Sequence, residues 1–338
     1  MLYAGIDVHR KSSYVSVIDG KGNRVAQRNL PSEVEAIAGF LGGLGEVPGI
    51  VMESTSAWYW LYDGLSERGY EVVVSDPRKT KAIASARIKN DKLDAHMLAR
   101  LLRADLVATV YVSPPEYREL KELLRHRVRL VRDKRRMKNR IHNLLAKNNI
   151  KLAVKDVFSR KGRILLESAP LPSCHRRPVD SYLALLDQLE AQIGQLDQEV
   201  KESAQRNPQA QLLMTLPGVG PVVAMTFLAE VGDISRFKTH RQLAAYVGMV
   251  PCLDSSAGKN RLGHISKQGS AWLRSALVEA AQVVANLKGR RLNLYFRKRI
   301  TKAGYKKAVV ATAHRLLQFA FYVLRDQRPY QEQLQKAA

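Results

Sequence analysis

The chain has 338 residues, of which 55 are Lys or Arg and 31 are Asp or Glu, so its formal net charge is +24. Its length accommodates two or three domains with cores of their own, and a hydrophobic content of 46% is typical of a globular rather than a disordered protein. The positive charge indicates a phosphate-rich partner. We expect a cytoplasmic protein without a membrane partner, because no apolar stretch approaches the roughly 20 residues of a spanning helix and no signal-peptide pattern is present. The two cysteines form no Cys-x-x-Cys pair, which argues against a disulfide or structural zinc.

Residues 1–110 show the pattern of an α/β domain. Apolar or alternating segments predict strands, and segments with apolar residues three and four positions apart predict helices. The first three strands are expected to form a meander, because the turn sequence Asp19-Gly20-Lys21-Gly22 joins the second to the third. The predicted order is strands over 2–7, 13–19 and 24–30, a helix over 33–44, a strand over 50–53, a helix through 58–65, a strand over 71–75 that stops at Asp76-Pro77, and a helix over 91–102.

Four acidic residues lie where a metal-dependent nuclease requires carboxylates. Asp7 and Glu53 each end an apolar strand segment, while Asp91 and Asp94 are three residues apart and therefore share one face of a predicted helix. An ionised carboxylate in a core costs several kcal/mol unless it is paired or bound to metal. Two-metal phosphodiester chemistry needs carboxylates from separate elements around ions about 3.5–4 Å apart. The set therefore predicts a site for Mg²⁺, or for Mn²⁺, which accepts the same oxygen ligands.

Each part of this set also has an ordinary structural explanation. Asn90 or Asp91 is suited to cap a helix, and Asp94 is favoured near the positive end of a helix dipole. Asp7 by itself suits the end of a strand. The order of the elements that carry the acids, rather than any single acid, favours the metal site.

The remainder of the chain is predicted to be mainly helical. Residues 118–163 carry seventeen Lys or Arg against four Asp or Glu. A charge run is usually a solvated helix face, but the length and imbalance of this one favour nucleic acid. A helix over 181–204 has apolar residues spaced by three and four between 186 and 200, which predicts packing on another helix, within the chain or across a dimer.

Prolines and polar composition mark the other boundaries. Three prolines, at 170, 172 and 178, predict a break over 168–178, and the Ser/Gly/Lys-rich segment 254–269 is expected to be a polar loop. Helices are predicted over 271–287 and 305–325. We therefore divide the chain into an α/β domain (1–112), a basic helical, coiled-coil-like region (113–206) and a mainly α C-terminal domain (207–338).

The order of strand Asp, meander, helix, strand Glu and helix Asp-x-x-Asp resembles a ribonuclease H-like nuclease fold of the Holliday-junction-resolvase type. The strings Tyr-Ala-Gly-Ile-Asp-Val-His-Arg-Lys, Val-Met-Glu-Ser-Thr and Lys-Asn-Asp-Lys-Leu-Asp-Ala are similar to those of the DEDD-type insertion-sequence transposases, which act as bridge-RNA-guided DNA recombinases. Leu-Pro-Gly-Val-Gly-Pro, Ala-Ala-Tyr-Val-Gly-Met-Val-Pro and Gly-His-Ile-Ser-Lys-Gln-Gly follow in the order of that family, so the resemblance covers nearly the whole chain.

The resemblance implies a serine nucleophile in the C-terminal domain. In the family, this serine attacks DNA and becomes joined to it through phosphate. The matching residue is Ser256, with Ser255 as the alternative, because the family usually has glycine where Ala257 follows here. Lys259, Arg261 and Lys267 are then expected to contact phosphate, from their charge and their proximity in sequence.

Two further features are expected to contact nucleic acid. Gly218 and Gly220 lie in a Pro-Gly-Val-Gly-Pro turn that resembles a helix-hairpin-helix, which offers backbone N–H groups to a phosphate; the alternative is a tight turn that needs glycine for its backbone angles. The basic helices, with Arg135, Arg136, Lys138 and Arg140, are implied by the family to hold a noncoding bridge RNA and double-stranded DNA.

We therefore expect a transposase that cuts and rejoins donor and target DNA with a DEDD metal site and a serine. The resemblance implies a homo-oligomer, a dimer or tetramer, in a prokaryotic cytoplasm and associated with the nucleoid. Two alternatives are a metal-dependent, structure-selective endonuclease that uses water, and a nonenzymatic nucleic-acid-binding protein. The four intact acids argue against the second.

Overall fold

The computed structural model describes residues 1–55, 57–83, 90–256 and 259–331, with the backbone alone described for 253–256 and 259–262. The chain divides into two compact units, Met1–Val112 and Ser113–Ala338. The predicted further division of the second unit at residue 206 stays a prediction. Within the described residues, no helix has both the length and the apolar character needed to cross a membrane.

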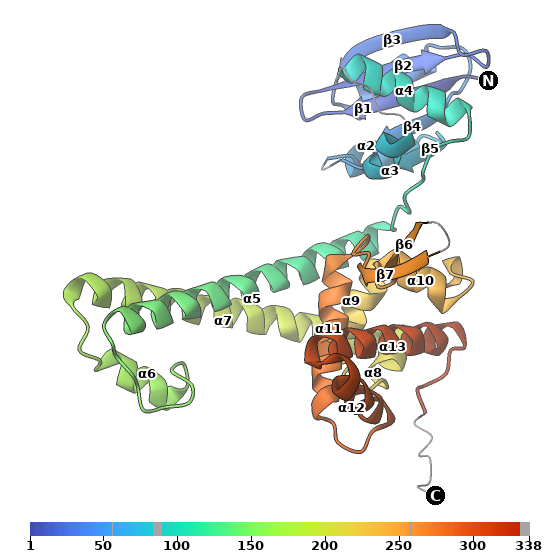
Figure 1. Ribbon diagram of the computed structural model, residues 1–338. Helices are drawn as coiled ribbons and strands as arrows, with labels where there is room; N and C mark the ends of the chain where they lie inside the picture. The colour runs from blue at the N-terminus through green and yellow to red at the C-terminus, as the bar shows by residue number, and fades with distance from the viewer. Residues whose placement is uncertain (56, 84–89, 257–258, 332–338) are drawn as a thin grey trace, which may run out of the picture. The chain divides into compact units, whose positions relative to one another are not determined.

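The first unit is built on a five-stranded mixed sheet with the strand order β3-β2-β1-β4-β5 (Figure 1). The first three strands form the predicted antiparallel meander, and β4 and β5 run parallel to β1. Its elements are β1 (Tyr3–Val8), β2 (Ser12–Ile18), β3 (Arg24–Pro31), α1 (Val34–Gly42), β4 (Gly49–Glu53), α2 (Tyr59–Ser66), β5 (Val72–Ser75), α3 (Pro77–Ile83) and α4 (Asp91–Arg103).

Different helices pack on the two faces of this sheet. Alternation along β1 sends Ala4, Ile6 and Val8 into a hydrophobic cluster that also includes residues of α1 and α2. The opposite face of β1 carries Gly5 and Asp7 and lies against α4. A Cβ at Gly5 would lie only 2.0 Å from the carbonyl oxygen of Ala95, so the absence of a side chain lets the helix backbone rest directly on the strand.

In the described part of the second unit, the regular structure is helical apart from one hairpin. A hydrophobic cluster assembled mainly from α8, α9, α10, α11 and α13 forms its main core, and a smaller cluster joins α5, α6 and α7. Its elements are α5 (Pro115–Lys147), α6 (Arg160–Glu167), α7 (Ser173–Arg206), α8 (Pro208–Met214), α9 (Pro221–Val231), a 3₁₀ turn (Ile234–Arg236), α10 (His240–Val247), β6 (Pro251–Ser256), β7 (Lys259–Ile265), α11 (Ala271–Asn286), α12 (Arg291–Ala303) and α13 (Tyr305–Arg325).

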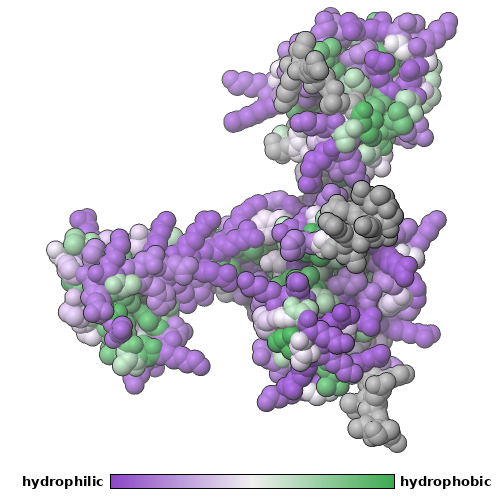
Figure 2. Space-filling model, viewed as in Figure 1, coloured by the Kyte–Doolittle hydropathy of each residue, from purple (hydrophilic) through white to green (hydrophobic). Residues whose placement is uncertain are grey.

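The apolar seam of α7 packs on α5 within the chain. Leu186, Ile193 and Val200 are buried, and α5 and α7 contact each other extensively. Acids of α7 also pair with cations of α5, as in the 2.9 Å contact between Lys134 and Glu190. Figure 2 shows mainly hydrophilic side chains on the visible face of this helix pair.

Two predictions about the polar and proline-rich segments are wrong. The expected polar loop over 254–269 instead contains the antiparallel hairpin of β6 and β7, whose backbone pairing compensates for a composition with little strand preference. The break expected over 168–178 ends earlier, because α7 begins at Ser173 and contains Pro178. A proline this close to the start of a helix removes one hydrogen bond, and Pro172 stands just before the helix, where proline is well tolerated.

Helices α3 and α12 were not singled out in the sequence analysis. The Asp76-Pro77 pair does end β5, but Pro77 also begins α3, since proline at the first helical position lacks only an N–H that would be unpaired there anyway. The helix α12 is strongly basic, and charge masks its apolar face of Leu292 and Phe296.

Replacing Gly5 by alanine should loosen α4 from the sheet. The new Cβ would overlap the α4 backbone, and overpacking of this kind costs about 1–3 kcal/mol. We expect faster hydrogen–deuterium exchange in the α4 amides of Gly5→Ala. The matched control is Gly39→Ala in α1, where no atom lies within 4 Å of the added Cβ and alanine should stabilise the helix by up to about 1 kcal/mol. Unchanged α4 protection in Gly5→Ala would contradict the packing argument.

Candidate metal centre

Asp7 is the buried member of the candidate site. It lies near the end of β1, beside Tyr14 of β2, and its exposed fraction is only 8%. Since Gly5 and Asp7 are two residues apart on a strand, both lie on the face that α4 covers. The Asp7 carboxylate is therefore enclosed between the sheet and the start of α4.

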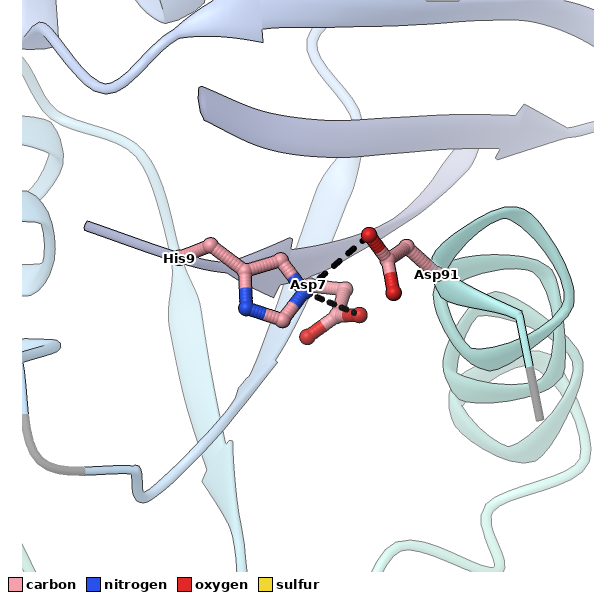
Figure 3. A group of neighbouring side chains, drawn as sticks. All are labelled: Asp7, His9 and Asp91. Carbon is pink, nitrogen blue, oxygen red and sulfur yellow. Dashed lines mark hydrogen bonds and ion pairs between the residues drawn. The ribbon is translucent and has the colours of Figure 1, made fainter. Parts of the chain in front are cut away.

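His9 is a member of the site that the sequence analysis missed. Its Nε2 lies 3.1 Å from Oδ2 of Asp7 and 3.3 Å from Oδ2 of Asp91, so one imidazole joins the two carboxylates (Figure 3). The hydroxyl of Ser32 donates to the His9 carbonyl at 2.7 Å and holds the chain where β1 ends. The available signal was the Asp-x-His spacing, which places both side chains on one side of an extended strand.

At the start of α4, different residues cap the helix and contribute to the candidate site. Asn90 is the N-cap, and its side chain accepts a hydrogen bond from the backbone N–H of Lys92 at 3.1 Å. Asp91 is thereby released from the capping role that the sequence left open for it, and its side chain meets His9 instead.

The structure brings only part of the predicted set into close contact. Among the described side chains, Asp7, His9 and Asp91 offer ligand atoms that all lie within 4.8 Å of one another. Glu53 ends β4 directly after Met52, which pairs with Ile6, so it lies beside Asp7 on the neighbouring parallel strand. Asp94 is half-buried one turn along α4. Both border the close group without belonging to it.

The electrostatics of the site are unfavourable to an ionised Asp7 by itself. Burial raises the pKa of Asp7 above its ordinary value, and the charges of Asp91 and Asp94 raise it further, while His9 acts in the opposite direction. Converging carboxylates with one buried member are a ligand set that a divalent cation would stabilise. Oxygen donors of this kind suit Mg²⁺, and Mn²⁺ also accepts the imidazole nitrogen.

The predicted serine region forms the β6–β7 hairpin, for which the structure describes mainly the backbone. Ser256 ends β6 and pairs through its backbone with Lys259, and Ser255 pairs with Asn260. The side chains of Ser255, Ser256, Lys259 and Arg261 lie outside the described part of the structure. Lys267 is exposed, follows β7, and has a left-handed backbone conformation with φ of 55°.

Gly218 shows a structural reason for the glycine turn between α8 and α9. Its φ is +81°, and a Cβ there would lie 2.5 Å from the carbonyl oxygen of Ala280 in α11. Gly220 is the N-cap of α9, and a Cβ there would meet no atom within 4 Å. The geometry thus accounts for Gly218 by packing and leaves the phosphate-binding role of the turn as a prediction.

The four α5 cations singled out by sequence differ in their surroundings. Arg135 and Arg136 are exposed, and Arg136 pairs with Asp133 at 2.8 Å. Lys138 and Arg140 lie over aromatic rings, those of Phe158 at 4.6 Å and Tyr182 at 5.5 Å. These contacts hold the last turns of α5 against neighbouring segments, and the nucleic-acid role of all four stays a prediction.

Comparison with known proteins identifies the family. A DEDD transposase model of the IS110 group matches residues 4–149, which include all four acids, and the transposase IS116/IS110/IS902 family model matches residues 210–307. A "Probable family 20 transposase" of Pseudomonas aeruginosa is 31% identical, over 70% of each chain. The transposase for insertion sequence element IS1111A of Coxiella burnetii is 28% identical over 96% of this chain and 90% of its own. The transposase for element IS1328 of Yersinia enterocolitica is 27% identical over 82% of each. The chain belongs to the IS110/IS116 family of insertion-sequence transposases.

Proposed function

We propose that the first unit is a ribonuclease H-like nuclease domain in which Asp7, Glu53, Asp91 and Asp94 hold Mg²⁺, with Mn²⁺ as a substitute. The observation that carries the proposal is the convergence of Asp7 and Asp91 on one side of β1, with His9 between them. An antiparallel meander followed by two strands parallel to β1 supports the fold assignment. Glu53 and Asp94 border the group from β4 and α4, so small side-chain movements would complete the set.

The metal and the protein divide the work at this site. Magnesium bound there would polarise the scissile phosphate and favour departure of the leaving oxygen. The chain supplies the fixed placement: the sheet holds Asp7 and Glu53, and α4 holds Asp91 and Asp94. His9 is a candidate further ligand, because its imidazole lies between the Asp7 and Asp91 carboxylates.

Ser256, with Ser255 as the alternative, is the proposed nucleophile that makes the enzyme a recombinase rather than a hydrolase. The serine hydroxyl loses a proton and its oxygen bonds to phosphorus. The bond from phosphorus to the oxygen of the departing strand breaks, and the departing oxygen takes up a proton. A hydroxyl of another strand then attacks the same phosphorus and releases the serine. Because the ester keeps the bond energy, joining needs no ATP. Its support is the family resemblance and the position of Ser256 at the end of β6.

Partners follow from the same proposal. Donor and target DNA are the substrates, and a noncoding bridge RNA pairs with both and selects the sequences, while the protein contacts backbone and shape. The basic helix α5 is the proposed RNA and DNA contact surface. A dimer or tetramer would bring nuclease units and serine hairpins of different subunits together, in the cytoplasm at the nucleoid.

Metal binding should depend on Asp7. At about a hundredfold excess over its dissociation constant, a bound ion adds about 2.7 kcal/mol of stability. We expect MnCl₂ or MgCl₂ to raise the melting temperature of the wild type and to have no such effect on Asp7→Asn. The control is Asp105→Asn, since Asp105 is exposed just beyond the far end of α4 and has a φ of 54°, which asparagine tolerates. An equal response in Asp7→Asn and the wild type would place the ion elsewhere.

Excision should require both the acids and the serine. We would express the gene within its native flanking noncoding DNA and detect the circular junction by PCR, with protein levels checked. The wild type should form the junction, whereas Asp94→Asn and Ser256→Ala should not. Ser266→Ala, ten residues further on, is the matched control and should keep activity. A junction that persists in Ser256→Ala would assign the nucleophile to Ser255 or to water, the latter being the structure-selective endonuclease.

A further inference from the structure

A second concentration of positive charge lies in and around α12, separate from the basic helix α5. Nine cations fall between residues 288 and 307, and the sequence contains no Asp or Glu from 280 to 325. These cations are Lys288, Arg290, Arg291, Arg297, Lys298, Arg299, Lys302, Lys306 and Lys307. All nine are exposed.

One face of α12 is firmly attached to the core, which leaves the basic face outward. Leu292 and Phe296 are buried in the main cluster of the second unit. Asn293 is fully buried, and its side-chain amide donates to the carbonyls of Val284 at 3.1 Å and Ala285 at 2.8 Å, at the end of α11. The helix is thus a fixed support for its cations.

Several of these charges lie where the helices disfavour them, although Arg299 also lies over the ring of Tyr295 at 5.3 Å. Lys306 and Lys307 lie in the first turn of α13, and Arg291 begins α12. Cations at the start of a helix oppose the helix dipole, and neither of these first turns contains an acid. Lys298 and Lys302 are four residues apart on one helix, a spacing at which like charges repel. By contrast, α5 has acids of α7 as partners, for example Glu190 for Lys134. A ligand with negative charge would relieve the repulsion around α12.

We propose that α12 and the start of α13 form a DNA-binding surface that contacts the phosphate backbone of a B-form duplex. Thirteen residues of α12 extend about 20 Å at 1.5 Å per residue. The major groove of B-DNA admits a helix, whereas that of A-form RNA is too deep and narrow. The inference rests on the proposed function, in which DNA is the substrate, and adds a binding surface in the second unit.

The test is the salt dependence of binding to a mixed-sequence DNA duplex, measured by fluorescence anisotropy. Each phosphate contact contributes about 0.9 to the slope of log K against log salt concentration. The variant Arg297→Gln/Lys298→Gln/Lys302→Gln removes three exposed cations and keeps good helix formers. We expect weaker binding and a slope lower by up to about 3. If the triple variant loses its helical circular-dichroism spectrum, the double variant Lys298→Gln/Lys302→Gln replaces it in the test, with an expected effect of about two thirds of that size.

The control has the same loss of charge elsewhere in the second unit. Lys201→Gln/Arg206→Gln/Lys238→Gln removes three exposed cations outside α12, so its slope should equal that of the wild type. An unchanged slope in the α12 variants would overturn the inference. An effect on an RNA duplex but not on DNA would also overturn it, because the surface would then belong to RNA. Neither result would affect the proposed function, which is tested separately by excision in Asp94→Asn and Ser256→Ala.

Discussion

The direct contact between the backbone of α4 and that of β1 is the constraint on which the candidate site depends. Gly5 has no side chain to separate them, and Ala95 and Ala99 present small residues from the helix. With this spacing, Asp7, two residues along the strand, meets Asp91, one turn back along α4. A larger residue at position 5 would move α4 away from β1 and separate the Asp7 and Asp91 carboxylates, although the sequence would still contain every acid. Gly5, which has no functional side chain, therefore determines how close the carboxylates of the site lie.

The same contact makes the site electrostatically costly. Asp7 is buried beside two further carboxylates, which raise its pKa, and the imidazole of His9 compensates in part. Stability alone would favour an apolar residue at the end of β1. A carboxylate there is understandable when a cation binds at the site, because the repulsion among the carboxylates then becomes affinity for the ion.

Local patterns predicted the first unit well, because its strands alternate clearly and its helices carry apolar stripes. They also predicted one site for Asp7, Glu53, Asp91 and Asp94, of which the structure brings Asp7 and Asp91 close together. They missed His9, since an Asp-x-His spacing is too common to single out without the Asp91 contact. They missed the β6–β7 hairpin because its stability comes from pairing between segments, not from the preference of either one. The start of α7 differs from the predicted break because a helix tolerates a proline near its start at the loss of one hydrogen bond.

Net charge indicated a nucleic-acid partner but could not say which cations are available to it. In α5 the count of positive charges is high, yet Lys134 pairs with Glu190, and Lys138 and Arg140 lie over aromatic rings. These cations partly serve to hold the helices of the second unit together. Around α12 no acid is near in the sequence, and the cations lie where the helix dipoles disfavour them. Cations in positions that a helix disfavours, such as Lys306 and Lys307, are thus stronger evidence for a phosphate surface than the α5 cations that pair with acids or lie over aromatic rings.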